Sequence, residues 1–223
     1  MHAFFLFLPV SCINGDYMDL WYYFINNLDN VIRLTAEHIV LVGVSVGFAV
    51  LIGVGLGVLI SYYQVLARGV LYICQVIMTI PSLAVFGLLI PLFGIGFKTG
   101  VIALVLYSLL PIVRNTYTGI EEIDPAVIQA AQGMGMNETN ILRKIKLPLA
   151  WPIIMAGIRT SVVMIIGIGA IASFVGAGGL GEFIFRGISQ WNMNSVLVGA
   201  IFVSIVAIVA DRLLKWAEHR TRV

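Results

Sequence analysis

Long runs of apolar residues without a single charge constrain this chain more than any other feature of its sequence. Residues 39–60 form an uninterrupted run of 22 uncharged residues. At about 1.5 Å per residue, a helix of that length crosses the roughly 30 Å hydrocarbon core of a membrane. Only 11% of the chain is charged, whereas soluble domains carry about 25% charged residues. The sequence therefore predicts an all-α integral membrane protein.

Five segments are apolar and long enough to be spans. The second contains Pro81 near its middle, so a kink is expected there. The third must continue past Pro111, because the part that precedes this proline is too short to cross a membrane. The fourth ends in a glycine-rich sequence, GAGGLG, which predicts a flexible turn. The expected spans are residues 39–60, 70–90, 99–120, 151–175 and 194–210.

The ends of the chain are expected to lie outside the membrane domain, which we place at residues 37–216. In the N-terminal extension, residues 1–36, apolar side chains recur over residues 20–34 at steps of one, three and four. That spacing predicts an amphipathic helix on the membrane surface. Residues 1–9 are too short for a span, and both a truncated signal-like segment and a translation start at Met18 fit them. Residues 217–223 are expected to be a polar cytoplasmic tail.

One polar segment, residues 124–148, interrupts the apolar pattern, and we call it the docking loop. Asp124 can cap a helix that begins at Pro125, where the missing N–H group has no cost. Gly133 and Gly135 should end this helix, and Asn137 can cap a second one. Pro148 should prevent the second helix from continuing unperturbed into the next span. The segment is therefore predicted to be a helix, a glycine turn and a helix.

Small side chains in the docking loop would let a partner protein approach the backbone closely. Ala130, Ala131 and Gly133 provide such a surface, and basic residues surround it. An ordinary helical hairpin between two spans is the simpler alternative. The basic residues are Arg143, Lys144 and Lys146.

The docking loop resembles a cytoplasmic loop in the membrane subunits of ATP-binding-cassette importers. The pattern of that family is E-A-A, three residues, G, nine residues, and I-x-L-P. Gln129 departs from the pattern, because it replaces the acidic first position with a neutral amide, which puts in doubt a charge-assisted contact from this residue to the ATPase. The residues that match in register are Ala130, Ala131, Gly135, Ile145, Leu147 and Pro148.

The resemblance extends over about residues 37–187 and is greatest to permeases that import glycine betaine, carnitine or choline. It rests on TIPSLAVFGLLIPLFGIG (residues 79–96), YSLLPIVRNTYTGI (107–120), AAQGMGM (130–136), LPLAWPIIMAGIRT (147–160) and GAGGLG. Methionine importers share GAGGLG but match the other stretches less well. The resemblance implies a type I importer transmembrane domain that moves an osmoprotectant by alternating access. An amino-acid importer of the methionine type is the nearest alternative, and an ion-coupled transporter or channel subunit is a more distant one.

The same resemblance implies partners for the chain. They are a second permease subunit, identical or diverged, a dimer of cytoplasmic ATPases that hold ATP and magnesium, and a periplasmic or lipid-anchored substrate-binding protein. The chain itself is expected to bind no cofactor and to catalyse no reaction, since it has no phosphate-binding loop of the G-x-x-x-x-G-K-[ST] type. Its net charge of +2 gives no sign of a nucleic-acid partner.

The basic residues predict the orientation in the bacterial cytoplasmic membrane. With the docking loop in the cytoplasm, ten of the 13 lysines and arginines lie on or near that side, which agrees with the positive-inside rule. Five spans then put the N-terminus outside and the C-terminus in the cytoplasm. The three basic residues outside are Arg33, Lys98 and Arg186.

Polar residues inside the spans are candidates for the substrate path, although such groups more often bond to neighbouring helices or to their own backbone. Arg159 could line a water-filled cavity, or it could have a structural role near the membrane surface. The expected spans contain no Asp, Glu or His, which argues against an intramembrane enzyme and against proton coupling. No metal site is indicated. The path candidates are Gln75, Thr79, Ser82, Tyr107, Asn115 and Arg159.

Overall fold

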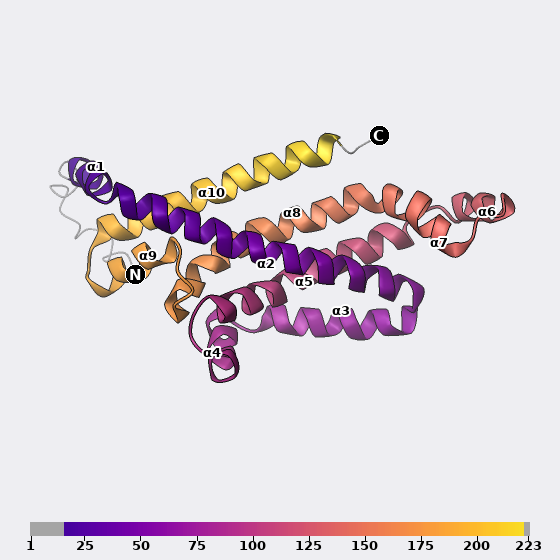
Figure 1. The fold of residues 1–223 in the computed structure, drawn as a ribbon, viewed down its shortest axis with the longest axis horizontal. Helices are drawn as coiled ribbons and strands as arrows, with labels where there is room; N and C mark the ends of the chain where they lie inside the picture. The colour runs from indigo at the N-terminus through magenta and orange to yellow at the C-terminus, as the bar shows by residue number, and fades with distance from the viewer. Residues whose placement is uncertain (1–15, 221–223) are drawn as a thin grey trace, which may run out of the picture.

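The computed structural model describes residues 16–220, which form helices packed lengthwise into one elongated bundle (Figure 1). No β-strand occurs in these residues. Four helices are long and apolar enough to cross a membrane, and a bent pair of shorter helices makes a fifth crossing if it is counted as one span. The prediction of an all-α membrane protein with about five spans is confirmed. The expectations for residues 1–9 and for the last three residues lie outside the described part of the chain.

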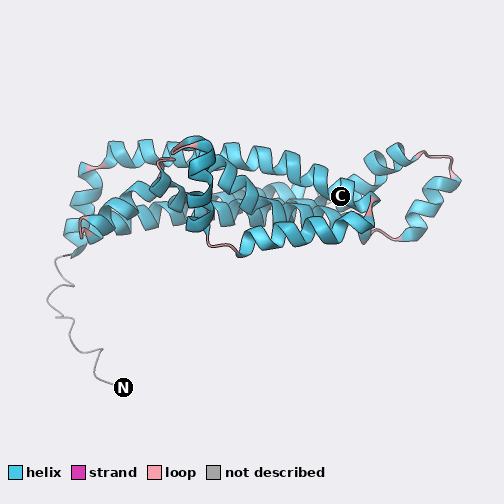
Figure 2. Ribbon diagram, turned by 90° about the horizontal axis from the view of Figure 1, so that it is seen from below, coloured by secondary structure: helices cyan, strands magenta, loops and turns pink. Residues whose placement is uncertain are grey.

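The long helices run between two ends of the bundle. Helices α6 and α7 lie at one end, and α1 and α9 lie at the other (Figures 1 and 2). In chain order the elements are α1 Asp16–Asn26, α2 Leu28–Tyr62, α3 Gln64–Thr79, α4 Ser82–Phe93, α5 Phe97–Glu121, α6 Pro125–Gly133, α7 Glu138–Ile141, a π-helical segment Leu142–Lys146, α8 Leu147–Ala172, a 3-10 turn Ser173–Val175, α9 Gly181–Ser189 and α10 Met193–Arg220.

The core lies where α2, α5 and α8 pack against one another, and small residues on α2 allow the close approach. A Cβ atom at Gly53 would lie 2.8 Å from Ile112 on α5, and one at Gly57 would lie 2.5 Å from Thr116. Such distances leave no room for a side chain, so Gly53 and Gly57 fix the spacing between α2 and α5. Gly43 and Gly47, which lie earlier in the same helix, have open space around them.

The expected surface helix over residues 20–34 is wrong as a single element. The chain breaks at Asn27, and residues 28–34 are the first turns of the long helix α2. Val31 and Leu34 are buried in a cluster with Leu180 of the glycine-rich turn and Phe183 of α9. Apolar periodicity shows that a helix has one apolar face, but it does not distinguish a membrane surface from a neighbouring helix as the partner of that face.

The kink expected at Pro81 is a complete break. Helices α3 and α4 meet at an angle of 101°. The residue before a proline favours extended backbone, and Ile80 has φ −69° and ψ 132°. Its carbonyl oxygen, which therefore lies outside the helix, accepts a hydrogen bond from the Tyr107 hydroxyl of α5. This side chain satisfies a backbone group that the break would otherwise leave unpaired.

The third span and the end of the fourth follow the predicted boundaries, whereas the helix of the fourth begins before the predicted residue 151. Helix α5 continues through Pro111 to Glu121. The stretch from Glu138 to Val175 is helical throughout, with a π-helical segment just before Pro148 in which the N–H of Leu147 bonds to the carbonyl of Leu142. Pro148 lacks an N–H group, and the wider turn absorbs that loss. The proline thus perturbs the helix without ending it.

Candidate docking loop and substrate path

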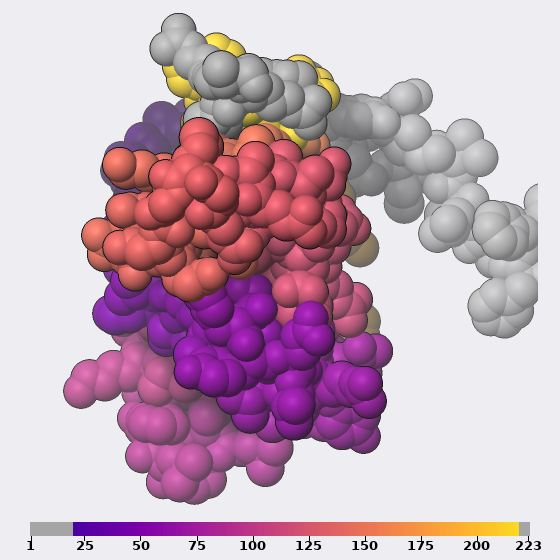
Figure 3. Space-filling view, turned by 90° about the vertical axis from the view of Figure 1, so that its right-hand side faces the viewer, coloured from indigo at the N-terminus to yellow at the C-terminus, as the bar shows by residue number. Residues whose placement is uncertain are grey.

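The docking loop projects from one end of the bundle, where it forms an exposed surface beside the end of α2 (Figure 3). Asp124 Oδ1 accepts a hydrogen bond of 2.8 Å from the N–H of Ala126 and caps α6, which begins at Pro125. Asn137 Oδ1 accepts one of 2.9 Å from Asn140 and caps α7. Both predicted caps are confirmed, so local sequence signals alone define where the two loop helices begin.

The turn between the two loop helices depends on one glycine. Gly135 has φ +78°, in the left-handed region that glycine adopts without strain. Its N–H bonds to the carbonyl of Gln132, and the N–H of Met136 bonds to the carbonyl of Ala131. This pair of bonds is a Schellman motif, which satisfies carbonyl groups at the end of α6. Gly133, the other glycine predicted to break the helix, is the last helical residue.

Most of the predicted contact residues of the docking loop face outward. Gln129, Ala130, Gly133, Gly135 and Pro148 are exposed, and Ile145 and Leu147 are half-buried. Ala131 is different, because only 1% of its surface is exposed. The expectation that Ala131 offers a close-approach surface to a partner is therefore wrong for this structure, and its small side chain serves packing within the loop.

A cation–π contact connects the docking loop to the end of α2. The Lys146 ammonium lies 5.3 Å from the centre of the Tyr62 ring. Such contacts contribute about 0.5–1 kcal/mol at exposed sites. The loop is thus continuous with α8 and also contacts the end of α2.

Two of the path candidates bond to backbone groups of the chain itself. Tyr107 is buried and donates to the Ile80 carbonyl, as described above. The Asn115 amide donates a hydrogen bond of 2.7 Å to the carbonyl of Pro111, four residues earlier in the same helix. The N–H group that Pro111 lacks would have bonded to the carbonyl of Tyr107, so the Pro111 carbonyl keeps its helical role and the amide adds a further hydrogen bond to it. The polar groups of both side chains are therefore bonded to backbone carbonyls of the chain and have a structural role.

The remaining polar candidates lie on or near α3. Gln75 is exposed and accepts a hydrogen bond of 3.1 Å from Arg114 of α5, while Thr79 is exposed and bonds to the carbonyl of Val76. Ser82 is half-buried at the start of α4. Gln75 and Thr79 are four residues apart in one helix and thus share a face. The structure pairs Gln75 with Arg114 and leaves both Gln75 and Thr79 exposed.

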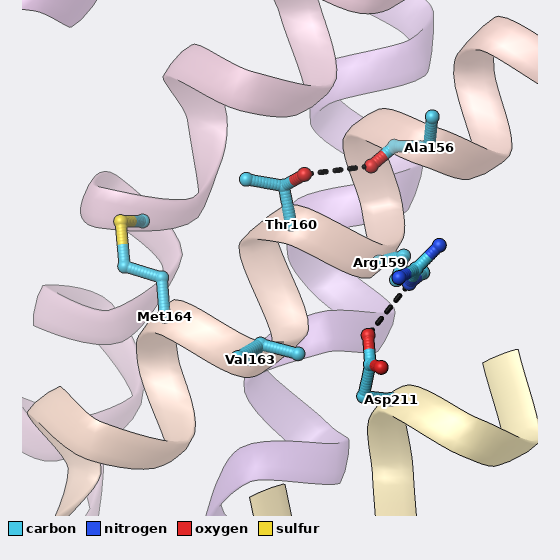
Figure 4. Close-up of a pocket in the computed structure, with 6 residues that line it drawn as sticks. All are labelled: Ala156, Arg159, Thr160, Val163, Met164 and Asp211. Carbon is cyan, nitrogen blue, oxygen red and sulfur yellow. Dashed lines mark hydrogen bonds and ion pairs between the residues drawn. The ribbon is translucent and has the colours of Figure 1, made fainter. Parts of the chain in front are cut away.

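Arg159 bridges two helices. Its Nε atom lies 2.6 Å from Asp211 Oδ1 of α10 (Figure 4). Its Nη1 atom lies 3.4 Å from Glu218 Oε2 of the same helix. A cavity of about 580 Å³ opens beside the pair and is also lined by Thr160 and Met164. The arginine thus connects α8 to α10, and its charge is compensated by two carboxylates. Asp211 comes directly after the segment expected as the fifth span, so the sequence pattern placed it outside the membrane.

Sequence reasoning missed a second polar cluster, which holds the GAGGLG turn against the start of α2. Glu37 accepts a hydrogen bond of 3.3 Å from the N–H of Gly179 and pairs with Arg33 at 2.9 Å. The neighbouring His38 is fully buried and lies 3.1 Å from the carbonyl of Ile166 in α8. Gly178 and Gly179 have positive φ angles, and a Cβ atom at either would lie within 3.0 Å of these side chains. The predicted flexible turn is therefore held in place.

One signal could have identified this cluster. Glu37 and His38 are two ionisable residues placed directly before an uncharged span. Among the described residues, no group of three or more His, Cys, Asp or Glu side chains could hold a metal ion.

Comparison with characterised proteins assigns the fold and the family. The chain is 45% identical to the osmoprotectant import permease protein OsmW of Salmonella typhimurium, over 92% of this chain and 96% of that protein. It is 43% identical to a glycine betaine/carnitine/choline transport system permease protein of Bacillus subtilis, over 88% and 86% of the two chains. It is 44% identical to a carnitine transport permease protein of Listeria monocytogenes, over 88% and 89%.

Solved structures show the same architecture. An inward-facing structure of the MetNI methionine transporter superposes with a TM-score of 0.79 at 23% identity, and covers 86% of this chain and 96% of that one. An amino-acid ABC transporter gives a TM-score of 0.74 at 20% identity, with 89% and 97% covered. The model of the family described as "Binding-protein-dependent transport system inner membrane component" matches residues 49–223. The chain belongs to this family of importer permeases.

Proposed function

We propose that this chain is the permease subunit of an ATP-driven importer that carries quaternary-ammonium osmoprotectants, such as glycine betaine, carnitine and choline, across a bacterial cytoplasmic membrane. One observation carries the proposal. The chain is 43–45% identical, over nearly its whole length, to permeases whose names give these substrates.

The alternatives have less support. The similarity to methionine and amino-acid transporters is close in fold, but at 20–23% identity it bears on the fold alone. The family is binding-protein-dependent, which favours an importer with a separate binding protein over an ion-coupled transporter or a channel. The chain is then no enzyme in itself, and ATP and magnesium belong to a partner ATPase.

The docking loop gives the proposal a mechanism of coupling. ATP closes an ATPase dimer whose surface contacts the exposed face of α6 that carries Gln129 and Ala130. Since α7 continues into α8 without a break, movement of the loop moves the fourth span as a rigid element. A second permease subunit completes the path, and the spans alternate between inward-open and outward-open arrangements. In this orientation α9 and the GAGGLG turn face outward, toward the substrate-binding protein.

Uptake by the assembled importer tests the function. The chain is expressed with its ATPase, its second permease and its binding protein in a host that lacks osmoprotectant uptake. Radiolabelled glycine betaine, carnitine, choline and methionine are then offered at high osmolarity. We expect import of at least one quaternary ammonium compound and none of methionine, and import should stop when the ATPase cannot hydrolyse ATP. Import of methionine alone would refute the proposed substrate class.

A further inference from the structure

A cavity of about 560 Å³ lies at the end of the bundle opposite the docking loop, between the 3-10 turn that follows α8 and the short helix α9. None of the residues that line it was a path candidate from the sequence. Its lining includes two aromatic and two charged side chains, those of Phe174, Phe185, Glu182 and Arg186.

Two aromatic rings form one wall of the cavity. The centres of Phe174 and Phe185 are 5.3 Å apart and the rings are inclined by 50°. Phe174 is 61% exposed, so its ring is not used to fill the core. The faces of aromatic rings carry partial negative charge and attract a cation within about 6 Å, and quaternary ammonium groups are the ligands that use this interaction most.

Two opposite charges lie on the same wall of the cavity. Glu182 and Arg186 are one helical turn apart on α9, and their side chains are 32% and 53% exposed. Charged groups are costly in hydrocarbon and almost always face a protein interior or a water-filled space. The charges therefore indicate that this wall, aromatic rings included, faces water or a partner rather than lipid.

The pairing of the two charges is loose. Arg186 Nη2 lies 3.5 Å from Glu182 Oε2, at the outer limit for a hydrogen bond. The hydroxyl groups of Ser173 and Ser189, which also line the cavity, already donate to backbone carbonyls at 2.8 Å. The carboxylate and the guanidinium are thus the polar groups most available to a ligand.

We infer that this cavity is a substrate subsite built for zwitterions that carry a quaternary ammonium group at one end and a carboxylate at the other. The ammonium group lies against the rings of Phe174 and Phe185 near Glu182, and Arg186 binds the carboxylate. The inference rests on the proposed function and names residues that would receive the substrate at the outer end. Choline has the ammonium group but no carboxylate, so it would use only the first half of the subsite.

This difference between substrates provides the test. Uptake of glycine betaine and of choline is measured in the same cells at several concentrations, for the complete importer with wild-type chain and with four variants. The variants are Phe174→Ala, Arg186→Gln, Arg186→Lys and Phe48→Ala. Phe48 is 53% exposed on α2 and does not line the cavity, so its variant controls for loss of an exposed ring. Copurification of the ATPase confirms that each variant assembles.

Each variant has its own expected pattern. Phe174→Ala should reduce the uptake efficiency of both substrates by about 2- to 30-fold, since cation–π contacts are worth about 0.5–2 kcal/mol and about 1.4 kcal/mol corresponds to a factor of ten. Arg186→Gln should lower the ratio of betaine to choline uptake by about threefold or more, and Arg186→Lys should largely restore it because the charge is kept. Phe48→Ala should behave as wild type.

The outcomes separate the two proposals. If the wild-type importer carries both substrates and none of the cavity variants changes the efficiency or the ratio, the subsite is refuted while the proposed function stands. An equal loss for both substrates in Arg186→Gln also refutes it, because the arginine then does not distinguish a carboxylate. If the wild-type importer carries none of glycine betaine, carnitine and choline, the proposed function fails, and the substrate class of the cavity fails with it.

Discussion

The two glycines of the docking loop should respond in opposite directions to the same substitution. Gly135 has φ +78°, whereas Gly133 is the last residue of α6. A Cβ atom would meet nothing within 4 Å at either position. The substitutions Gly135→Ala and Gly133→Ala therefore add the same methyl group to the same exposed loop, and only the backbone conformation differs between them.

The expected free-energy change of each substitution follows from the backbone conformation at its position. An alanine in the left-handed region costs about 1–2 kcal/mol. In a helical conformation, alanine is better than glycine by about 0.5–1 kcal/mol, mostly because the unfolded chain loses less entropy. Gly135→Ala should thus open the turn about 5–30 times more often than wild type. Gly133→Ala should open it less often.

Hydrogen exchange of the loop amides measures this opening directly. The N–H groups of Gly135 and Met136 donate the two bonds of the turn, so a peptide that contains them should exchange faster in Gly135→Ala and more slowly in Gly133→Ala. Gly135→Asn should exchange at nearly the wild-type rate, because asparagine tolerates the left-handed region. Equal exchange in the two alanine variants would refute the reasoning.

Three further predictions follow from packing, charge and orientation. Gly57→Ala should lower the unfolding temperature in detergent, because overpacking costs about 1–3 kcal/mol. Gly43→Ala, whose added methyl group meets open space, should leave the unfolding temperature unchanged. Equal unfolding temperatures for the two variants would show that α2 and α5 can separate. Gln129→Glu should keep or strengthen ATP-driven uptake and Gln129→Lys should weaken it, and equal uptake would mean that this residue does not face the ATPase. With Cys12 and Cys74 replaced, a cysteine at Asn192 should react with an impermeant reagent in intact cells and one at Thr139 only in opened cells; labelling of position 139 from outside would reverse the orientation.

Local signals in the sequence predicted the docking loop well. Asp124 and Asn137 cap the helices that they were expected to cap, because a cap depends on residues within one turn. The length of each apolar run likewise predicted where the third span begins and ends and where the fourth ends, since membrane thickness sets that length. The family also followed from residue patterns, because the stretches between residues 79 and 181 that resemble importer permeases lie in a chain that the family comparison assigns to them.

Features that depend on distant partners could not be predicted. Pro81 indicated a kink, but the 101° break also uses the hydroxyl of Tyr107, which lies 27 positions from Ile80 along the chain. Glu37 holds Gly179 across 142 positions. Ala131 matched the family pattern, yet its burial depends on how the loop folds. In each case the deciding contact lies outside any local window.

Site-specific photocrosslinking to the ATPase tests the central claim most directly. A photoreactive residue replaces Gln129 on the exposed face of α6, and the control replaces Trp191, which is 96% exposed in the turn between α9 and α10. The assembled importer is irradiated in membranes and the crosslinked protein is identified. We expect position 129 to crosslink to the ATPase and position 191 not to do so. A crosslink to the ATPase from position 191, or none from position 129 in an importer that transports, would contradict it.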